Sequence, residues 1–228
     1  MSVAGKLVVV AGATSASGLA AARVLTAANA RVVAVGRDSE KLRTLSRAVD
    51  AGVRTEVCDL TDEAAVAALA RRVHDADGPV DGVVHLVGGW RGGGGLAGQS
   101  EADFRLLEKS FTALRHVSRE FDADLRASDA GRLAVVSSTA VVRPLAGGAN
   151  YAAVKAATES WTRAVAQGFS KDARDAGRQV TAASVIFRVK SLAGLEDELA
   201  HRFAGLWTRP ASEINDTIVE LTDENGHP

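Results

Sequence analysis

The only tyrosine of the chain, Tyr151, stands four residues before Lys155. In a helix this spacing places both side chains on one face, one turn apart. A phenol with a pKa of about 10 is a poor acid or base at neutral pH, but a nearby ammonium favours the phenolate and lowers that pKa. The two residues are therefore a candidate general acid/base pair. A helix-start aromatic beside a solvent-exposed lysine is the plainer interpretation of the same spacing.

Ser138 stands at the end of a predicted strand, thirteen residues before Tyr151. At that place its hydroxyl could hydrogen-bond the carbonyl or alcohol oxygen of a substrate. Ser138, Tyr151 and Lys155 are the predicted catalytic residues.

A glycine turn near the N-terminus favours dinucleotide binding. Residues 11–18 read Ala-Gly-Ala-Thr-Ser-Ala-Ser-Gly and lie between a predicted strand and a predicted helix. Glycine lets the backbone approach a phosphate closely, and a helix N-terminus supplies free N–H groups and a positive dipole end. The predicted phosphate-binding residues are Gly12, Thr14, Ser15, Ser17 and Gly18. An ordinary turn between a strand and a helix would read the same in isolation.

Two further strand ends carry charged residues that a dinucleotide could use. An NAD site usually has an acidic residue at the end of the second strand, whereas an arginine there suits the 2′-phosphate of NADP. The second predicted strand is followed by Arg37, which favours NADP, although this arginine can equally be solvated or paired with Asp38 or Glu40. Asp59 follows the third strand and could accept a hydrogen bond from adenine, although a turn or capping role is commoner.

Alternating strands and helices position these residues. Six short segments predict strands at residues 6–11, 31–35, 53–58, 82–87, 133–137 and 180–186, and the first is almost wholly apolar, as in a fully buried strand. The intervening segments predict helices at residues 19–28, 39–49, 61–75, 101–126, 151–168, 195–206 and 210–221, with Ser39 and Thr61 as caps. This alternation predicts an α/β fold, a Rossmann-like doubly wound parallel sheet of about six strands with helices on both faces. Residues 1–228 are expected to form one domain.

Composition excludes several other classes of protein. With 27 Lys+Arg against 28 Asp+Glu, the 228-residue chain has no electrostatic case for nucleic acid or an acidic membrane as a partner. The lone cysteine, Cys58, cannot form an internal disulfide, and neither it nor the histidines have the spacing of a metal site. The first apolar run is too short for a signal sequence or a membrane span. We therefore expect a soluble cytoplasmic protein without a metal.

Over nearly its whole length, the sequence resembles the short-chain dehydrogenase/reductase family. The resemblance rests on the glycine turn, the strand-end serine and the intact Tyr-x-x-x-Lys pattern. It implies an NAD(P)-dependent oxidoreductase that transfers a hydride between the nicotinamide cofactor and a carbonyl or alcohol substrate. Tyr151 would be its acid/base, Lys155 would bind the nicotinamide ribose and lower the pKa of the tyrosine, and Ser138 would orient the substrate oxygen.

The resemblance implies further contacts and partners. Asp59 and Leu60 would lie along the adenine, and Val87 and Gly88 beside the adenosine ribose. The cofactor would be NADP, with NAD possible, the substrate would be a small molecule, and the protein would be a homodimer or homotetramer. Small residues along the helix after Tyr151 fit a subunit interface, and core packing explains them equally well.

The sequence departs from the family pattern around the cofactor and the proton relay. Ala11 and Ala16 replace a threonine and the middle glycine of the phosphate loop. His85-Leu86-Val87-Gly88 replaces Asn-Asn-Ala-Gly, and His85 could supply one of the lost hydrogen bonds. The relay asparagine falls near Ser110 or Phe111, and the Pro-Gly after the sixth strand is missing. The last strand of the family and its glycine-rich tail are expected to be absent.

These departures leave two functions open. An active oxidoreductase is favoured because all three catalytic residues are retained, and the alternative is a catalytically weak or inactive nucleotide-binding scaffold. Trp90 is expected either to line a substrate pocket or to be a loop aromatic fixed by local packing. Phe203 and Trp207 are expected either in a substrate lid or in simple helix packing.

Overall fold

The computed structural model describes residues 2–49 and 53–222. Within these ranges seven strands form one parallel sheet in the order β3-β2-β1-β4-β5-β6-β7. The strands are β1 (Leu7–Ala11), β2 (Arg31–Gly36), β3 (Val53–Val57), β4 (Gly82–His85), β5 (Arg132–Ser138), β6 (Ala183–Val189) and β7 (Thr217–Leu221). The helices are α1 (Ala16–Ala27), α2 (Ser39–Ala48), α3 (Glu63–Asp77), α4 (Glu101–Glu120), α5 (Asp122–Ala127), α6 (Ala149–Asp175), α7 (Glu196–Gly205) and α8 (Ala211–Ile214).

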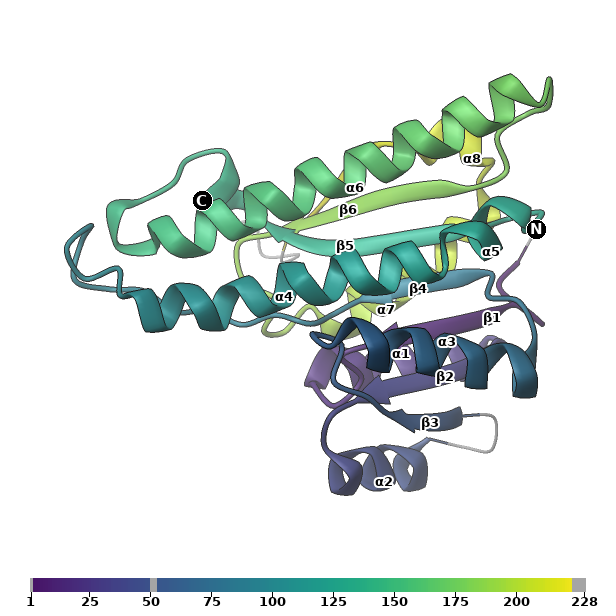
Figure 1. The fold of residues 1–228 in the computed structure, drawn as a ribbon, viewed down its shortest axis with the longest axis horizontal. Coiled ribbons are helices and arrows are strands. Elements are labelled where there is room, and N and C mark those ends of the chain that lie inside the picture. The colour runs from purple at the N-terminus through teal and green to yellow at the C-terminus, as the bar shows by residue number, and fades with distance from the viewer. Residues whose placement is uncertain (1, 50–52, 223–228) are drawn as a thin grey trace.

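The helices cover both faces of the sheet (Figure 1). Successive residues of a strand point to opposite faces, so Val8 and Val10 of β1 pack with α1, α2, α7 and α8. Leu7 and Val9 pack with α3, α4, α5 and α6 on the other face. The predicted doubly wound α/β fold is confirmed. Among the described residues, none of the helices is long and apolar enough to cross a membrane.

The sequence predicts about six strands, whereas the described sheet has seven. The sequence predicts one helix over residues 210–221, but α8 ends after four residues and β7 follows. Asn215 ends the helix, because its Oδ1 accepts from Ser184 N (3.0 Å) and its Nδ2 donates to Ala166 O (2.9 Å). Asp216 then takes a φ of 63°, which turns the chain into β7 beside β6. The strand expected to be absent is therefore present.

Two helix caps and several element boundaries also differ from the prediction. α1 begins at Ala16 rather than at residue 19, and β6 spans Ala183–Val189 rather than residues 180–186. Asp38 caps α2 and Asp62 caps α3, in place of Ser39 and Thr61. The helix predicted over residues 101–126 is divided into α4 and α5, which meet at Phe121. α6 begins two residues before Tyr151 and continues to Asp175.

Phe203 and Trp207 are core residues. Both are fully buried, and their rings meet edge to face with centroids 5.3 Å apart. A Cβ added at Gly82 of β4 would lie 2.7 Å from the Trp207 ring, so the indole requires this glycine beneath it. The helix-packing interpretation is confirmed. Residues 190–195, which join β6 to α7, form no helix or strand.

β5 begins with a guanidinium that is buried among backbone carbonyls. Arg132 is 1% exposed, and its guanidinium carbon lies 6.0 Å from the centre of the Trp207 ring. It donates hydrogen bonds of 2.8–3.1 Å to the carbonyl oxygens of Gly131, Thr181, Leu206 and Arg209. Burial lowers the pKa of Arg132 to about 10. Arg132 thereby ties the segment after α7 to the sheet.

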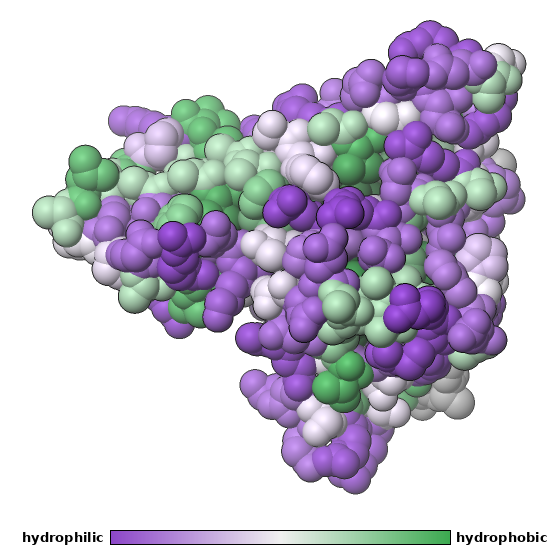
Figure 2. Space-filling view, in the orientation of Figure 1, coloured by the Kyte–Doolittle hydropathy of each residue, from purple (hydrophilic) through white to green (hydrophobic). Residues whose placement is uncertain are grey.

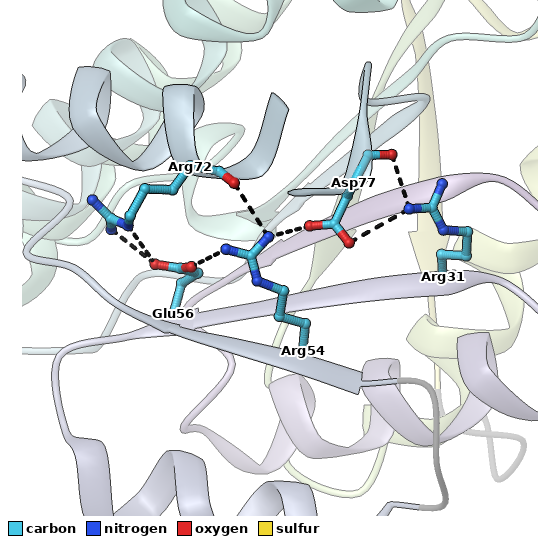
Figure 3. Close-up of polar contacts among 5 residues, drawn as sticks. All are labelled: Arg31, Arg54, Glu56, Arg72 and Asp77. Atoms are coloured by element: carbon cyan, nitrogen blue, oxygen red, sulfur yellow. Dashed lines mark hydrogen bonds and ion pairs between the residues drawn. The ribbon is translucent and has the colours of Figure 1, made fainter. Parts of the chain in front are cut away.

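The edge strand β3 is fastened to α3 by ion pairs (Figure 3). Arg54 of β3 lies between Glu56 and Asp77 and contacts both carboxylates. Arg72 of α3 pairs with Glu56 (2.8 Å), and Arg31 of β2 pairs with Asp77 (3.4 Å). Because both carboxylates are mostly buried, the network fixes the helix over the edge strand, and its charges discourage pairing with a foreign strand.

Candidate active site

The carboxyl ends of β1, β2, β3 and β4 open onto a cleft of about 400 Å³. Ligands of open parallel sheets bind at this edge. Eight of the predicted cofactor residues line it: Gly12, Thr14, Ser15, Arg37, Asp59, Leu60, Val87 and Gly88. Four predicted cofactor residues do not line the cleft: Ser17 and Gly18 are buried in the first turn of α1, and Tyr151 and Lys155 lie on α6.

The glycine turn is shaped by its own packing. Gly12 has a φ of 91°, and a Cβ there would lie 2.8 Å from Val87 N. A Cβ at Gly18 would lie 2.4 Å from Ala13 O, so this glycine permits α1 to pack on the turn. Ser15 Oγ accepts from Gly18 N and donates to Gly12 O, both at 3.0 Å. Its hydroxyl therefore caps α1 and is not a free donor.

Ala16, which replaces the middle glycine of the family pattern, fits the turn without strain. Among the described residues other than glycine, positive φ occurs only at Asn29 and Asp216. Ala16 is the first residue of α1 and is exposed. An alanine methyl is compatible with this negative φ.

Sequence reasoning missed several residues that line the cleft, among them Gly36, Arg91 and Lys109. The methyl of Thr14 lies over Gly36, where a Cβ would approach it to 2.7 Å. A glycine at the end of a predicted strand could have indicated this close contact. Lys109 gave no signal, because only the fold brings α4 to the cleft. Trp90 lines the cleft and is also 61% exposed.

Asp59 faces the cleft as a charged turn residue. Its Oδ1 accepts from Thr61 N (3.0 Å) and Thr61 Oγ1 (2.8 Å). These bonds hold the pKa of Asp59 below its ordinary value, and the nearby charges of Arg37 and Lys109 lower it further. Two cations therefore stand near the β2 and β3 end of the cleft.

The three predicted catalytic residues lie together. Ser138 ends β5 and is buried, with Ala140 N donating to its Oγ (3.2 Å). Tyr151 lies in the first turn of α6, with its hydroxyl near enough to the Ser138 side chain for that group to lower the phenol pKa. Lys155, one turn later, donates from Nζ to Val136 O (2.7 Å), and its Nζ lies 5.8 Å from the centre of the Tyr151 ring. A Cβ at Gly88 would lie 3.7 Å from this Nζ, so the lysine adjoins the cleft.

Burial controls the titration of both helix residues. The pKa of Tyr151 is raised by burial, which outweighs the opposing effect of the Ser138 side chain. The lowering of this pKa by Lys155 stays a prediction; in the structure the lysine Nζ donates to Val136 O and lies 5.8 Å from the centre of the Tyr151 ring. Burial lowers the pKa of Lys155 to about 8, against the opposing charge of Glu159.

β6 continues where the family pattern has Pro-Gly. Arg188 and Val189 pair with Ser137 and Ser138 of β5. Arg188 also donates to both carboxylate oxygens of Glu159 (3.1 and 2.8 Å), one turn beyond Lys155. This nearly buried pair joins the end of β6 to the helix that carries Tyr151.

Residues 6–175 match the family model of the short chain dehydrogenase. The chain belongs to the short-chain dehydrogenase family. A 3beta-hydroxysteroid dehydrogenase of Mediterraneibacter gnavus is 32% identical over 166 residues, covering 71% of this chain and 59% of that protein. Nodulation protein G of a Rhizobium species is 31% identical over 166 residues, covering 72% of this chain and 66% of that protein. The matched part thus spans about three fifths to two thirds of the length of these relatives.

A solved structure agrees over a longer range. A metagenomic short-chain oxidoreductase in complex with NADP is 30% identical and superposes with a TM-score of 0.83. The match covers 98% of this chain and 100% of that one. Residues 176–222 therefore share the fold of that short-chain dehydrogenase relative.

In this short-chain dehydrogenase, His85 joins β4 to α4. His85 is 4% exposed, and its Nε2 lies 3.0 Å from Ser110 O, to which it must donate. Ser110 is one of the two positions that the family pattern gives for the relay asparagine. Burial lowers the pKa of His85 to about 4, with a further contribution from the charge of Lys155. Across residues 2–49 and 53–222, no group of three or more His, Cys, Asp or Glu could hold a metal ion.

The free energy of unfolding is expected to decrease between pH 6.5 and pH 4 because of His85. In this window the unfolded chain, with an ordinary pKa of 6.5, binds a proton that the folded chain, with a pKa of about 4, does not bind. Stability therefore rises with pH across the window. From pH 7 to pH 5 this residue removes about 2 kcal/mol from the free energy of unfolding.

Denaturant unfolding at pH 7 and pH 5 measures this effect. His85→Asn, whose amide can still donate to Ser110 O, should lose that part of the pH dependence. The exposed His201→Asn is the matched control and should keep it. An unchanged pH dependence in His85→Asn would contradict the assignment.

Proposed function

We propose that the protein is an NADP-preferring oxidoreductase of a carbonyl/alcohol pair, with Tyr151 as its acid/base. One observation carries the proposal. Lys155, which lies one turn from Tyr151, adjoins a cleft that eight of the predicted dinucleotide-binding residues line. The NADP complex of the similar oxidoreductase supports the cofactor class. The hydroxysteroid dehydrogenase among the relatives supports the reaction class.

The residues of the cleft fit a phosphorylated dinucleotide. Gly12 gives the backbone a side-chain-free approach at the N-terminus of α1, where an anion is favoured. Arg37 and Lys109, both close enough to Asp59 to lower its pKa, supply positive charge for a 2′-phosphate. Leu60 and Val87 offer apolar contact to adenine and ribose. When bound, the nicotinamide ring of the cofactor supplies or accepts the hydride.

Each of the three catalytic side chains has a separate role in the reaction. Ser138 Oγ, at the end of β5, donates a hydrogen bond to the substrate oxygen and so orients it. The Tyr151 hydroxyl gives that oxygen a proton in reduction and takes it back in oxidation. The Lys155 ammonium, held by Val136 O beside Gly88, would bind the nicotinamide ribose and stabilise negative charge on the phenol oxygen.

The loops that follow β4 and β5 expose apolar side chains. Trp90, Leu96, Val142 and Leu145 are each more than half exposed, and they come from the loops that follow β4 and β5. Figure 2 shows hydrophobic surface in green at the end of the molecule where these loops lie in Figure 1. These side chains support a small-molecule substrate whose carbonyl or alcohol is attached to an apolar body.

We further propose a single-domain, cytoplasmic homodimer or homotetramer. All seven described strands belong to one sheet, which supports a single domain. Ala153, Ala156 and Ala164 expose small side chains along α6, which supports close packing of a second copy there. The lone buried Cys58 is compatible with a reducing compartment.

Arg37→Ala is expected to weaken NADPH binding about tenfold or more and to leave NADH binding unchanged, because only NADPH carries the 2′-phosphate that this guanidinium would contact. Fluorescence titration of the protein with each nucleotide measures both affinities. Arg47→Ala, at an exposed position in the last turn of α2, is the matched control.

Three results would count against the proposal. If the wild-type protein binds neither nucleotide, the oxidoreductase function is wrong. If NADPH binds but no aldehyde, ketone or alcohol of a broad panel is turned over, the scaffold alternative is favoured. Equal loss of NADH and NADPH affinity in Arg37→Ala would remove the argument for NADP.

A further inference from the structure

Two segments that are distant in the sequence meet beside Tyr151, at the left end of the molecule in Figure 1. One is the loop between β4 and α4, and the other is the segment that leads into α6. Gly93 N donates to Gly147 O (2.7 Å), and Asn150 Nδ2 donates to Ser100 O (3.2 Å). A Cβ at Gly92 would lie 2.4 Å from Gly147 O, so the close contact of the two backbones requires glycine there.

The carboxamide of Gln99 lies at the centre of this contact. Its Oε1 accepts a hydrogen bond from Asn150 N (3.1 Å), one residue before Tyr151. Its Nε2 donates to Gly147 O (3.0 Å) and to two carbonyls of its own loop, those of Gly93 and Gly95 (both 3.2 Å). Both ends of the amide are therefore engaged, and one side chain joins the loop to the first turn of α6.

α6 has no cap of its own. The first four N–H groups of a helix lack intrahelical partners, and a side chain just before the helix usually accepts from one of them. Ser15, Asp38, Asp62 and Ser100 do this for α1, α2, α3 and α4. Gly148 stands at this position of α6 and has no side chain to offer. Gln99, from a loop about fifty residues away, accepts from the second N–H of the helix instead.

We propose that Gln99 is a positioning residue that caps α6 from the neighbouring loop and thereby holds the phenol of Tyr151 against Ser138. The inference rests on the proposed function of Tyr151. Because the same loop carries Trp90 and Arg91 into the cofactor cleft, Gln99 also connects the wall of the cleft to the helix that carries the acid/base.

The single tyrosine allows a test that does not depend on activity. The ultraviolet absorbance of the phenolate reports the titration of Tyr151 alone, since the chain has no other phenol. In the wild type burial raises this pKa. In Gln99→Leu, which removes all four hydrogen bonds, we expect the titration to move toward the ordinary phenol value of about 10. We also expect hydrogen exchange of the Asn150 amide to become about fivefold faster, as for loss of a cap.

Asn150→Ala is the matched control. It removes the bond to Ser100 O between the same two segments but keeps the N–H that Gln99 accepts, so both readouts should match the wild type. Gln99→Ala is a second variant with less apolar bulk and should repeat the effects of Gln99→Leu. The proposal is overturned if the Tyr151 titration and the Asn150 exchange in both Gln99 variants equal those of the wild type.

Activity adds an independent readout. With NADPH and a reactive ketone, kcat of Gln99→Leu should fall about tenfold, because the phenol is no longer held beside Ser138. KM for NADPH should stay within about twofold of the wild-type value, because the cofactor contacts remain. An unchanged kcat would overturn the positioning role. If the wild type itself has no turnover, the proposed function fails, and the titration and exchange still decide whether Gln99 orders the helix.

Discussion

Tyr151→Phe is expected to lower kcat about a thousandfold, the size of effect typical of a lost general acid/base. Phenylalanine keeps the half-buried ring but removes the hydroxyl that lies against Ser138. No second phenol exists in the chain to replace it. Lys155 is a poor substitute, because its Nζ donates to Val136 O (2.7 Å). Steady-state kinetics with NADPH and a panel of aldehydes and ketones measures the loss.

The control for this variant is nucleotide affinity. Tyr151 does not line the cofactor cleft, so Kd for NADPH should change less than about twofold, a difference well below 1 kcal/mol. Retention of more than about a tenth of the wild-type kcat would show that another group moves the proton, and the assignment of Tyr151 would be wrong.

Lys155→Met is expected to abolish activity and yet to raise the free energy of unfolding at pH 7 by up to about 3 kcal/mol. Burial lowers the pKa of Lys155 from 10.5 to about 8. Below pH 8 the folded protein therefore holds a buried charge that is more favourable in the unfolded chain. The lost bond to Val136 O and the lost attraction of Glu159 offset part of the gain, which sets the upper bound.

The pH dependence of stability separates this effect from simple repacking. Between pH 8 and pH 10.5 the unfolded chain binds a proton at Lys155 that the folded chain has lost, so the wild type should gain stability as pH rises. The methionine variant should lack this gain. Lys109→Met, at an exposed position of the same site, is the matched control and should not change stability. A less stable Lys155→Met protein at pH 7 would contradict the account.

The fold was predictable where side-chain pattern and burial coincide. The six predicted strands became β1 to β6. The central ones are apolar because strands that are covered on both faces tolerate little polar sequence, whereas the edge strand β3 carries Arg54 and Glu56. β7 was missed because residues 210–214 have a helical sequence pattern, which gives no indication that the helix ends at Ile214. That end is set by Asn215, whose amide binds the backbone of β6 and α6 rather than its own helix. An Asn-Asp pair before the β-branched Thr217-Ile218-Val219 was the available signal.

The candidate site was predictable in its local motifs only. The glycine turn and the Tyr-x-x-x-Lys spacing report residues that are neighbours in the sequence. Gln99 and Lys109 gave no such signal, because each acts on groups that are distant in the chain, as in the bond from Asn150 N to Gln99 across 51 positions. The rise in the pKa of Tyr151 also escaped prediction, since it comes from burial in the folded protein.

The buried guanidinium of Arg132 has a consequence for how the chain becomes folded. The stretch that matches the family model ends at residue 175, whereas three of the four carbonyls that receive Arg132 lie beyond it, at Thr181, Leu206 and Arg209. A fragment ending at residue 175 would leave this cation without those carbonyls and the edge of β5 open to pairing with other chains. We therefore expect the part that matches the family model to need the later residues, at least as far as Arg209, in order to fold.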